Sequence, residues 1–505
     1  MTRKDPPARQ QPAGPAAASR APGVDRRRLL TLGGGIAALA VGGTAVALAT
    51  SHGGGTPAAA GTNQAAPTDP DTGWDPGTLP TAVGQDSVTD AVNVLVAAQN
   101  KALATKDKAA FTAAYAPGPA ATQAAIMFDN IQQFDFVTLQ YQVIGQGGRV
   151  FDAGTGADVQ MDIALVHQLR DVDGAALPEW YRWSLSRAAG AGPFTITAVN
   201  GSPSIGGSDK YVYYPAAWDS TSPITVIKRQ NTLLVATSAA DAATLQGVAD
   251  LAAQCVATNR AGWKQGAGHA GVAPGALFLG TSDKSTFYTW YSGQANKYGS
   301  EAGLTIPMLT AASQDDPSTT VAIGGSRIVL DLTSQFFTAQ SGEVGPEALI
   351  QHEDAHNMVF SIMTAAEFSI PTWVIEGFAD FMATRTDPDP LRDYFRIPDI
   401  KQYDQGEGGL KWDGATLPDN ADVYSIYPAQ NSACYGLATL AYYYIFQKLA
   451  MPGVIAFLTA NYSVPPSGGF NGHDSLDSAI AQVLGTDTGT FQQEWAAFVH
   501  QTIGA

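Results

Sequence analysis

The chain has 505 residues, which is too long for one ordinary hydrophobic core and predicts two or three folded units with tails. Its 45 acidic side chains outnumber the 28 basic ones and give a formal net charge of −17. Because no basic stripe is available to neutralise phosphates, the composition argues against nucleic acid as a partner.

The N-terminus has the layout of an export signal or a membrane anchor. Residues 1–28 form a basic tail, and residues 29–50 form an uncharged run rich in Ala, Gly, Val and Leu. Arg26-Arg27-Arg28-Leu29-Leu30 resembles a twin-arginine signal. The run 47–49 offers a small-x-small cleavage site, whereas 22 uncharged residues are long enough to span a bilayer with the basic tail inside the cytoplasm. Both alternatives predict an extracytoplasmic protein, and a retained segment adds the membrane as a partner.

A flexible linker and a first folded unit are expected next. Residues 51–88 are rich in Gly, Ala, Pro and Thr and lack periodicity, which is typical of a linker. Residues 89–202 begin with a helix pair and continue with a series of strands, a pattern that predicts an α+β unit with a curved sheet packed on helices. The helix pair is expected over 91–115 and the strands over 136–144, 159–169, 180–186 and 194–199. This element order is similar to that of the nuclear-transport-factor-like (SnoaL-like) domains.

Residues 220–505 are expected to form a mainly helical domain with a small β-sheet. Helical patterns dominate after residue 346, and the Pro- and Gly-rich stretch 386–422 is predicted to be a long loop at a functional rim. Cys255 and Cys434 are the two cysteines, and the sequence leaves open whether they pair or remain free thiols. The remaining elements expected here are a hairpin over 224–235, a helix over 239–259, and strands over 275–279 and 321–332.

The residues that carry chemistry begin with His352-Glu353-Asp354-Ala355-His356. Pro346 suits the first position of a helix, and the apolar positions that follow sustain that helix through the motif. His352 and His356 are four residues apart and therefore lie on one helical face, where two imidazoles can bind one metal ion. Glu353 lies beside them and is free to act as a base.

A catalytic metal also needs a third protein ligand and an open position. Glu376 lies on a second predicted helix, which follows a short link, and two antiparallel helices would bring its carboxylate to the histidines. Asp380 follows one turn later on the same face. Its carboxylate could accept the second ring N–H of a ligand histidine, with His352 the expected partner.

His-Glu-x-x-His followed by Trp-x-x-Glu-Gly-x-Ala resembles the gluzincin zinc metallopeptidases, specifically peptidase MA-like domains and, more distantly, the aminopeptidase N group. Glu-x-x-x-Asp over 376–380 also resembles the thermolysin pattern. The resemblance is firm over 345–385 and loose over 275–460. It implies one Zn²⁺ per chain held by His352, His356 and Glu376, a metal-bound water activated by Glu353, and a peptide or protein substrate. It further implies an edge strand above the zinc, for which 327–332 is the candidate.

Gluzincins also use a tyrosine or a histidine to stabilise the oxyanion of the tetrahedral intermediate. Residues 427–436 precede an apolar helix that is expected to end near Leu449, and they resemble the tyrosine-containing segment of peptidase MA-like domains. Tyr435 is the first choice for this role and Tyr427 the second.

Peptide hydrolysis is the leading hypothesis, and two others stay open. One is a non-catalytic binding or scaffold protein at the cell surface, whose zinc site is structural or vestigial. The other is hydrolysis of a substrate that is not a peptide. The intact Glu353 favours catalysis, because a structural zinc normally takes four protein ligands and has no use for an unligated carboxylate. The lack of a Gly-x-Met-x-Asn signature favours an endopeptidase.

Overall fold

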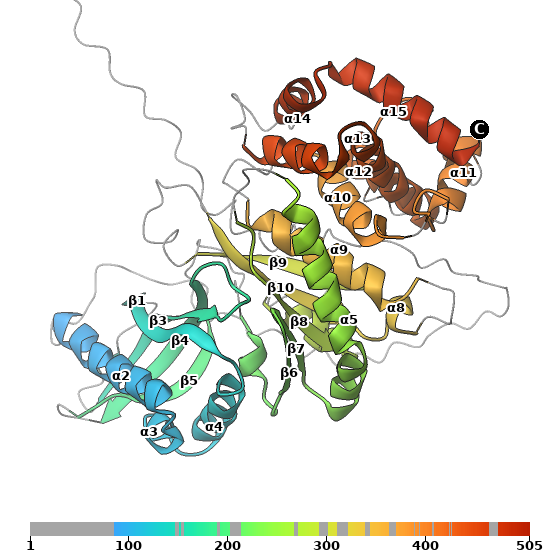
Figure 1. Ribbon diagram of the computed structural model, residues 1–505. Helices are drawn as coiled ribbons and strands as arrows, with labels where there is room; N and C mark the ends of the chain where they lie inside the picture. The colour runs from blue at the N-terminus through green and yellow to red at the C-terminus, as the bar shows by residue number, and fades with distance from the viewer. Residues whose placement is uncertain are drawn as a thin grey trace, which may run out of the picture.

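The computed structural model shows a mixed α+β chain with two small sheets and a helical C-terminal region (Figure 1). It describes residues 85–146, 151–152, 156–188, 192–202, 214–266, 271–291, 301–310, 322–338, 344–362 and 370–504, apart from 388, 393, 407–408, 424, 426 and 464–472. The predicted export segment over 29–50 lies outside the described residues. No helix within these ranges combines the length and the apolar character needed to cross a bilayer.

The N-terminal unit (residues 85–202) places helices before an antiparallel sheet. Its helices are α2 (Gln85–Thr105), α3 (Lys108–Thr112) and α4 (Pro119–Ile131). Its strands are β1 (Phe136–Gln146), β3 (Gly156–Leu169), β4 (Leu177–Ala188) and β5 (Thr195–Gly201), paired in the order β1-β3-β4-β5, and β2 (Phe151–Asp152) pairs with β3. The four predicted strands are confirmed, whereas α4 was not predicted. Helix α2 includes the last four residues of the expected linker, 85–88.

The second sheet, called the central sheet below, mixes parallel and antiparallel pairs. It consists of β6 (Thr225–Arg229), β7 (Thr232–Ala236), β8 (Ala276–Thr281), β10 (Ile323–Asp331) and β9 (Gly303–Leu309), in that spatial order. β7, β8 and β10 are parallel, and β9 runs antiparallel to β10. The prediction of an edge strand at 327–332 is therefore wrong, because β10 lies between β8 and β9. The edge beside β10 is β9, which the sequence did not reveal.

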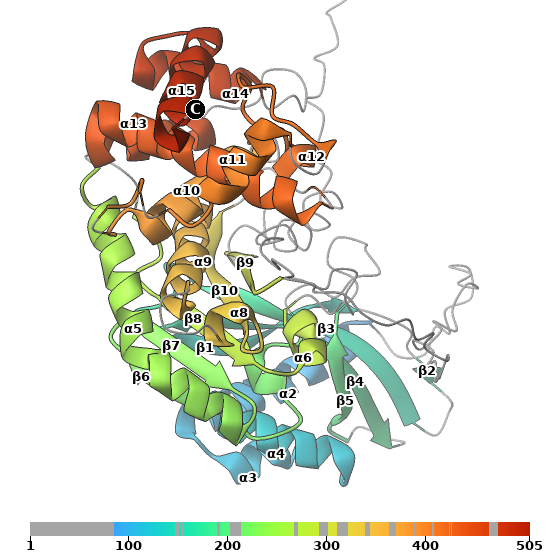
Figure 2. The ribbon, with the colours of Figure 1, turned by 90° about the vertical axis from the view of Figure 1, so that its right-hand side faces the viewer.

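The central sheet is buried on both faces. Along its strands, Leu234, Phe278 and Ile328 pack in one cluster with helices α5 (Ala239–Trp263) and α9 (Pro346–Phe360). Their sequence neighbours Val235 and Leu279 belong instead to a cluster that continues into the N-terminal unit. This alternation follows the two-residue period of a strand. The central sheet is thus one layer between the helix pair and the N-terminal unit, as a view from the side shows (Figure 2).

A buried ion pair and backbone hydrogen bonds fix the N-terminal unit to β10. The guanidinium of Arg327 donates to both carboxylate oxygens of Asp173 at 2.7 and 3.2 Å, and both side chains are fully buried. The amides of Gly174 and Ala175 donate to the carbonyl of Gly324. Both charges of the Arg327–Asp173 pair are therefore buried in the interface between the two units.

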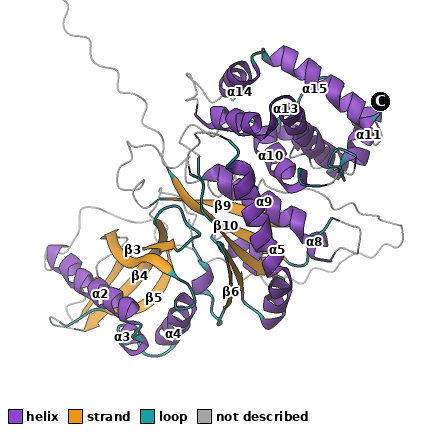
Figure 3. Ribbon diagram, viewed as in Figure 1, coloured by secondary structure: helices purple, strands orange, loops and turns teal. Residues whose placement is uncertain are grey.

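The C-terminal region consists of helices joined by loops, with no strand among the described residues (Figure 3). Gly377 on α10 (Thr372–Thr384) has no room for a Cβ, which would lie 2.5 Å from the carbonyl oxygen of Ala438 on α13 (Pro428–Ser463). The prediction of a loop over 386–422 is wrong where α11 (Ile397–Gln405) and α12 (Asn420–Val423) form. Cys255 and Cys434 are both buried, and they do not form a disulfide. The helices are α10 (Thr372–Thr384), α11 (Ile397–Gln405), α12 (Asn420–Val423), α13 (Pro428–Ser463), α14 (His473–Ala479), a π-helical turn at Ile480–Leu484, and α15 (Thr488–Ile503); the short helices α6 (Lys284–Thr289) and α8 (Gln335–Thr338) lie earlier in the chain.

Candidate metal centre

Helices α9 and α10 bring three metal-binding side chains together. Nε2 of His352 lies 3.1 Å from Nε2 of His356, and each of these nitrogens lies 3.4 Å from Oε2 of Glu376. All three side chains are buried, and they form the one group among the described residues whose ligand atoms could hold a metal ion. The structure thus brings together the two histidines and the carboxylate that the sequence singled out.

The separations between these three atoms fit a zinc ion. Two ligand atoms bound about 2.0–2.1 Å from zinc in tetrahedral geometry are roughly 3.3 Å apart. The observed separations of 3.1, 3.4 and 3.4 Å agree with that value. Burial alone would raise the pKa of Glu376, but the neighbouring histidines hold it below its usual range, so the carboxylate is ionised and available as a ligand. The donor set of two imidazoles and one carboxylate is also that of catalytic zinc sites.

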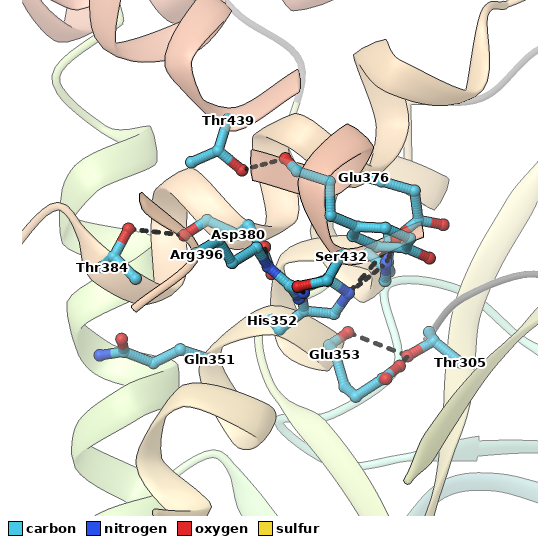
Figure 4. A network of polar contacts seen from close by, with 12 residues as sticks. Thr305, Gln351, His352, Glu353, Glu376, Asp380, Thr384, Arg396, Ser432 and Thr439 are labelled. Atoms are coloured by element: carbon cyan, nitrogen blue, oxygen red, sulfur yellow. Dashed lines mark hydrogen bonds and ion pairs between the residues drawn. The ribbon is translucent and has the colours of Figure 1, made fainter. Parts of the chain in front are cut away.

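A chain of polar contacts orients His352 from behind (Figure 4). Nδ1 of His352 lies 2.8 Å from Oδ1 of Asp380, while Oδ2 of Asp380 accepts from Nε of Arg396 at 2.7 Å and from the hydroxyl of Tyr394 at 3.2 Å. Arg396 in turn donates to Oγ of Ser432 at 3.1 Å. A proton on Nδ1 facing Asp380 leaves the Nε2 lone pair for a metal. The expected role of Asp380 thus has a contact to support it.

The charged neighbours of Asp380 keep its carboxylate ionised. Burial would raise the pKa of Asp380, but Arg396 and His352 hold it well below its usual range. Burial lowers the pKa of His352, yet hydrogen bonds with Asp380 and Glu376 raise it to about 10 in the metal-free chain. A metal ion bound to His352 would therefore take the place of a proton.

Glu353 follows His352 on α9, and its carboxylate contacts strand β9. Its Oε2 accepts a hydrogen bond from Oγ1 of Thr305 at 2.6 Å, and Oε1 is buried without a hydrogen-bond partner among the described residues. A Cβ added to Gly303 would lie 2.6 Å from Oε1, so the carboxylate packs directly on the backbone of that glycine. Burial raises the pKa of Glu353, which makes the carboxylate a better proton acceptor.

The face of α9 turned to α5 is anchored by a separate group. Asp354 accepts hydrogen bonds from Arg260 at 2.6 Å and from the side-chain amide of Asn259 at 2.9 Å. Arg260 also donates to the carbonyls of Ala273 and Gly275. The residue after Glu353 therefore fixes the rotation of α9 relative to α5.

The two candidate tyrosines lie in different surroundings. Tyr435 is fully buried in α13, and the guanidinium of Arg396 stacks 5.0 Å from the centre of its ring. Tyr427 precedes α13 and is 56% exposed. The expectation that residues 427–436 precede the apolar helix is wrong, because this helix, α13, begins at Pro428. The expected end of the helix near Leu449 agrees with the non-helical backbone at Ala450. Tyr435 is linked to the metal ligands through Arg396, and its role in stabilising an oxyanion stays a prediction.

The sequence did not identify Gly303, Thr305, Tyr394 and Arg396 as residues of this site. Gly303 and Thr305 lie on the strand that was not predicted, and Tyr394 and Arg396 lie in the stretch that was taken for a loop. These four residues do not form a sequence motif that would predict a binding or catalytic role. A buried arginine requires a carboxylate partner, but the sequence does not show which arginine is buried.

No family model matches the chain, and neither curated proteins nor solved structures include a significant match.

Proposed function

We propose that this chain is an extracytoplasmic zinc-dependent peptidase that hydrolyses peptide bonds in peptides or proteins. The observation that carries the proposal is the convergence of His352, His356 and Glu376 at separations of 3.1–3.4 Å, with Glu353 next to His352 on α9 and its carboxylate held by strand β9. Three protein ligands leave a coordination position open, which separates a catalytic zinc site from a structural one.

The residues have distinct roles in this proposal. A zinc ion bound by the two histidines and Glu376 would polarise the scissile carbonyl and lower the pKa of water. Glu353 accepts the proton of the attacking water through Oε1 and passes it to the nitrogen of the leaving amine as the C–N bond breaks. Asp380 and Arg396 hold His352 in the tautomer that binds the metal. Tyr435 is proposed to stabilise the oxyanion, with Tyr427 as the second candidate.

The test compares wild type with Glu353→Gln, which keeps the size of the side chain and removes its basicity. We expect one zinc per chain in both proteins by elemental analysis, and cleavage of a quenched peptide library by wild type alone. Loss of a general base lowers kcat by about 100- to 10,000-fold. Zinc in both proteins without cleavage in either would favour a vestigial site or a non-peptide substrate. A chain that binds no zinc would overturn the proposal.

Export, proposed from the basic tail and the uncharged run, has its own test. Protease added to intact cells is expected to digest a protein displayed outside the cytoplasm, and substitution of Arg26 and Arg27 by Lys is expected to retain the chain inside. A size difference between the cytoplasmic precursor and the exported chain then separates a cleaved signal from a retained anchor.

A further inference from the structure

Two residues of strand β9 contact the carboxylate of Glu353, and neither of them is a candidate metal ligand. Thr305 donates its hydroxyl to Oε2, and Gly303 packs against Oε1. We propose that these two residues are positioning residues that hold Glu353 beside the metal and out of its coordination sphere. This inference rests on the proposed function, since it assigns a role to Glu353 as a base.

The need for such a restraint follows from the position of Glu353. It is adjacent in sequence to His352, and both side chains leave the same turn of α9. A divalent cation held by His352, His356 and Glu376 would attract a second carboxylate strongly, because the site is buried and poorly screened. A glutamate has three rotatable bonds through which to reach that cation. If Glu353 became a fourth protein ligand, the open position would close and the base would be lost.

The hydroxyl of Thr305 is suited to prevent this movement. Oγ1 lies 2.6 Å from Oε2 of Glu353 and 3.0 Å from the backbone carbonyl oxygen of the same residue. It therefore ties the end of the side chain close to its own backbone, as the view of the site shows (Figure 4). Thr305 is fully buried, so no solvent is at hand to replace its hydrogen bond.

Gly303 limits Glu353 from the other side. A Cβ at this position would lie 2.6 Å from Oε1 and 2.8 Å from both Cδ and Cγ of Glu353. Any larger residue must displace the carboxylate. Residues 303 and 305 point to the same face of β9, and pairing of Leu304 with Val329 and of Thr305 with Ile328 fixes that strand on β10. The two contacts thus come from one rigid element that is separate from α9 and α10.

The experiment uses the full chain loaded with Zn²⁺ or with Co²⁺, whose visible absorption reports coordination. Thr305→Val removes the hydroxyl at constant shape, and Thr305→Ser keeps it. Thr232→Val is the matched control, because Thr232 is a fully buried strand residue whose hydroxyl has no hydrogen-bond partner among the described residues. Gly303→Ala is the second variant, with Gly247→Ala as its control, since nothing lies within 4 Å of a Cβ at Gly247.

We expect Thr305→Val to lower kcat by about 10- to 100-fold with KM within about twofold, the range for loss of a hydrogen bond to a charged group. One zinc per chain should remain, the cobalt absorption should change, and binding of acetohydroxamate to the cobalt form should weaken. Gly303→Ala should show the same changes. Thr305→Ser, Thr232→Val and Gly247→Ala should resemble wild type in all readouts.

Unchanged cobalt absorption and unchanged acetohydroxamate binding in both Thr305→Val and Gly303→Ala would overturn the inference, and so would loss of the metal itself from these variants. If wild type cleaves no peptide, the proposed function fails, while the cobalt spectra still decide whether β9 keeps Glu353 away from the metal. The two failures are therefore distinguishable.

Discussion

Removing the charge of Arg327 tests how firmly the N-terminal unit is built into the molecule. Arg327→Met leaves a side chain of similar length and strands the carboxylate of Asp173, which is fully buried. Breaking a buried ion pair by removing one partner costs about 3–5 kcal/mol. The chain offers a matched control, because Lys228 of β6 pairs with Asp135 of the N-terminal unit at 2.6 Å across the same two units. That pair is exposed, at 43% and 67%, so Lys228→Met should cost only about 0–1 kcal/mol.

The assay is urea unfolding followed by tryptophan fluorescence. A loss of about 3–5 kcal/mol is a large part of the roughly 5–15 kcal/mol that stabilises a typical protein, so the midpoint should shift clearly. Adding Asp173→Asn to Arg327→Met should restore much of the loss, since the amide oxygen keeps an acceptor for the backbone N–H of Leu169, which now donates to Oδ2 at 2.8 Å. Equal effects of Arg327→Met and Lys228→Met, or no recovery in the double variant, would refute the reasoning.

Two further predictions concern zinc affinity and pH. Arg396→Met should lower zinc affinity about 10- to 100-fold, measured by competition with a chelator, because it removes the partner that orients Asp380 behind His352; Arg392→Met, at an arginine with a 72% exposed side chain, is the control. Burial raises the pKa of Asp219 from 3.8 to about 7. The folded chain then holds a proton that the unfolded chain has lost between about pH 4 and 7, so the free energy of unfolding should fall as pH rises through this window. Asp219→Asn should flatten that slope, and an unchanged slope would contradict the assignment.

Much of the architecture could be predicted from local patterns. The strands over 159–169 and 180–186 were predicted from their alternating, strand-like pattern, and the structure places β3 and β4 there. The metal-binding motif was visible because a helix requires His352 and His356 to share a face. Glu376 could be paired with them because it lies on a second predicted helix after a short link, and two antiparallel helices bring its carboxylate to the histidines.

Strand β9 could not be predicted for physical reasons. Its sequence alternates the apolar residues Leu304, Ile306 and Met308 with Gly303, Thr305 and Pro307, but glycine and proline are depleted in strands and typical of turns and loops. Pro307 argues against a strand in the middle of a sheet but is tolerated at an edge, where one side of the strand needs no partner. The residues that hold Glu353 were hidden for the same reason.

The contacts of Arg396 were hidden for a different reason. The residue precedes α11 in a stretch whose prolines and glycines are typical of a loop. Arg396 contacts Asp380, Ser432 and Tyr435, and all three side chains come from other helices. No local pattern encodes contacts between residues 16–39 positions apart.

The shared core of the central sheet limits how this molecule could be switched on. Proteolytic removal of a segment is one way in which proteins are switched on. Here a cut between residues 202 and 214 would sever the backbone but leave Val235, Leu277 and Leu279 packed in the same cluster as the N-terminal unit. The two fragments would remain together as a nicked complex, so any control of the proposed activity has to come from a source other than loss of the N-terminal unit.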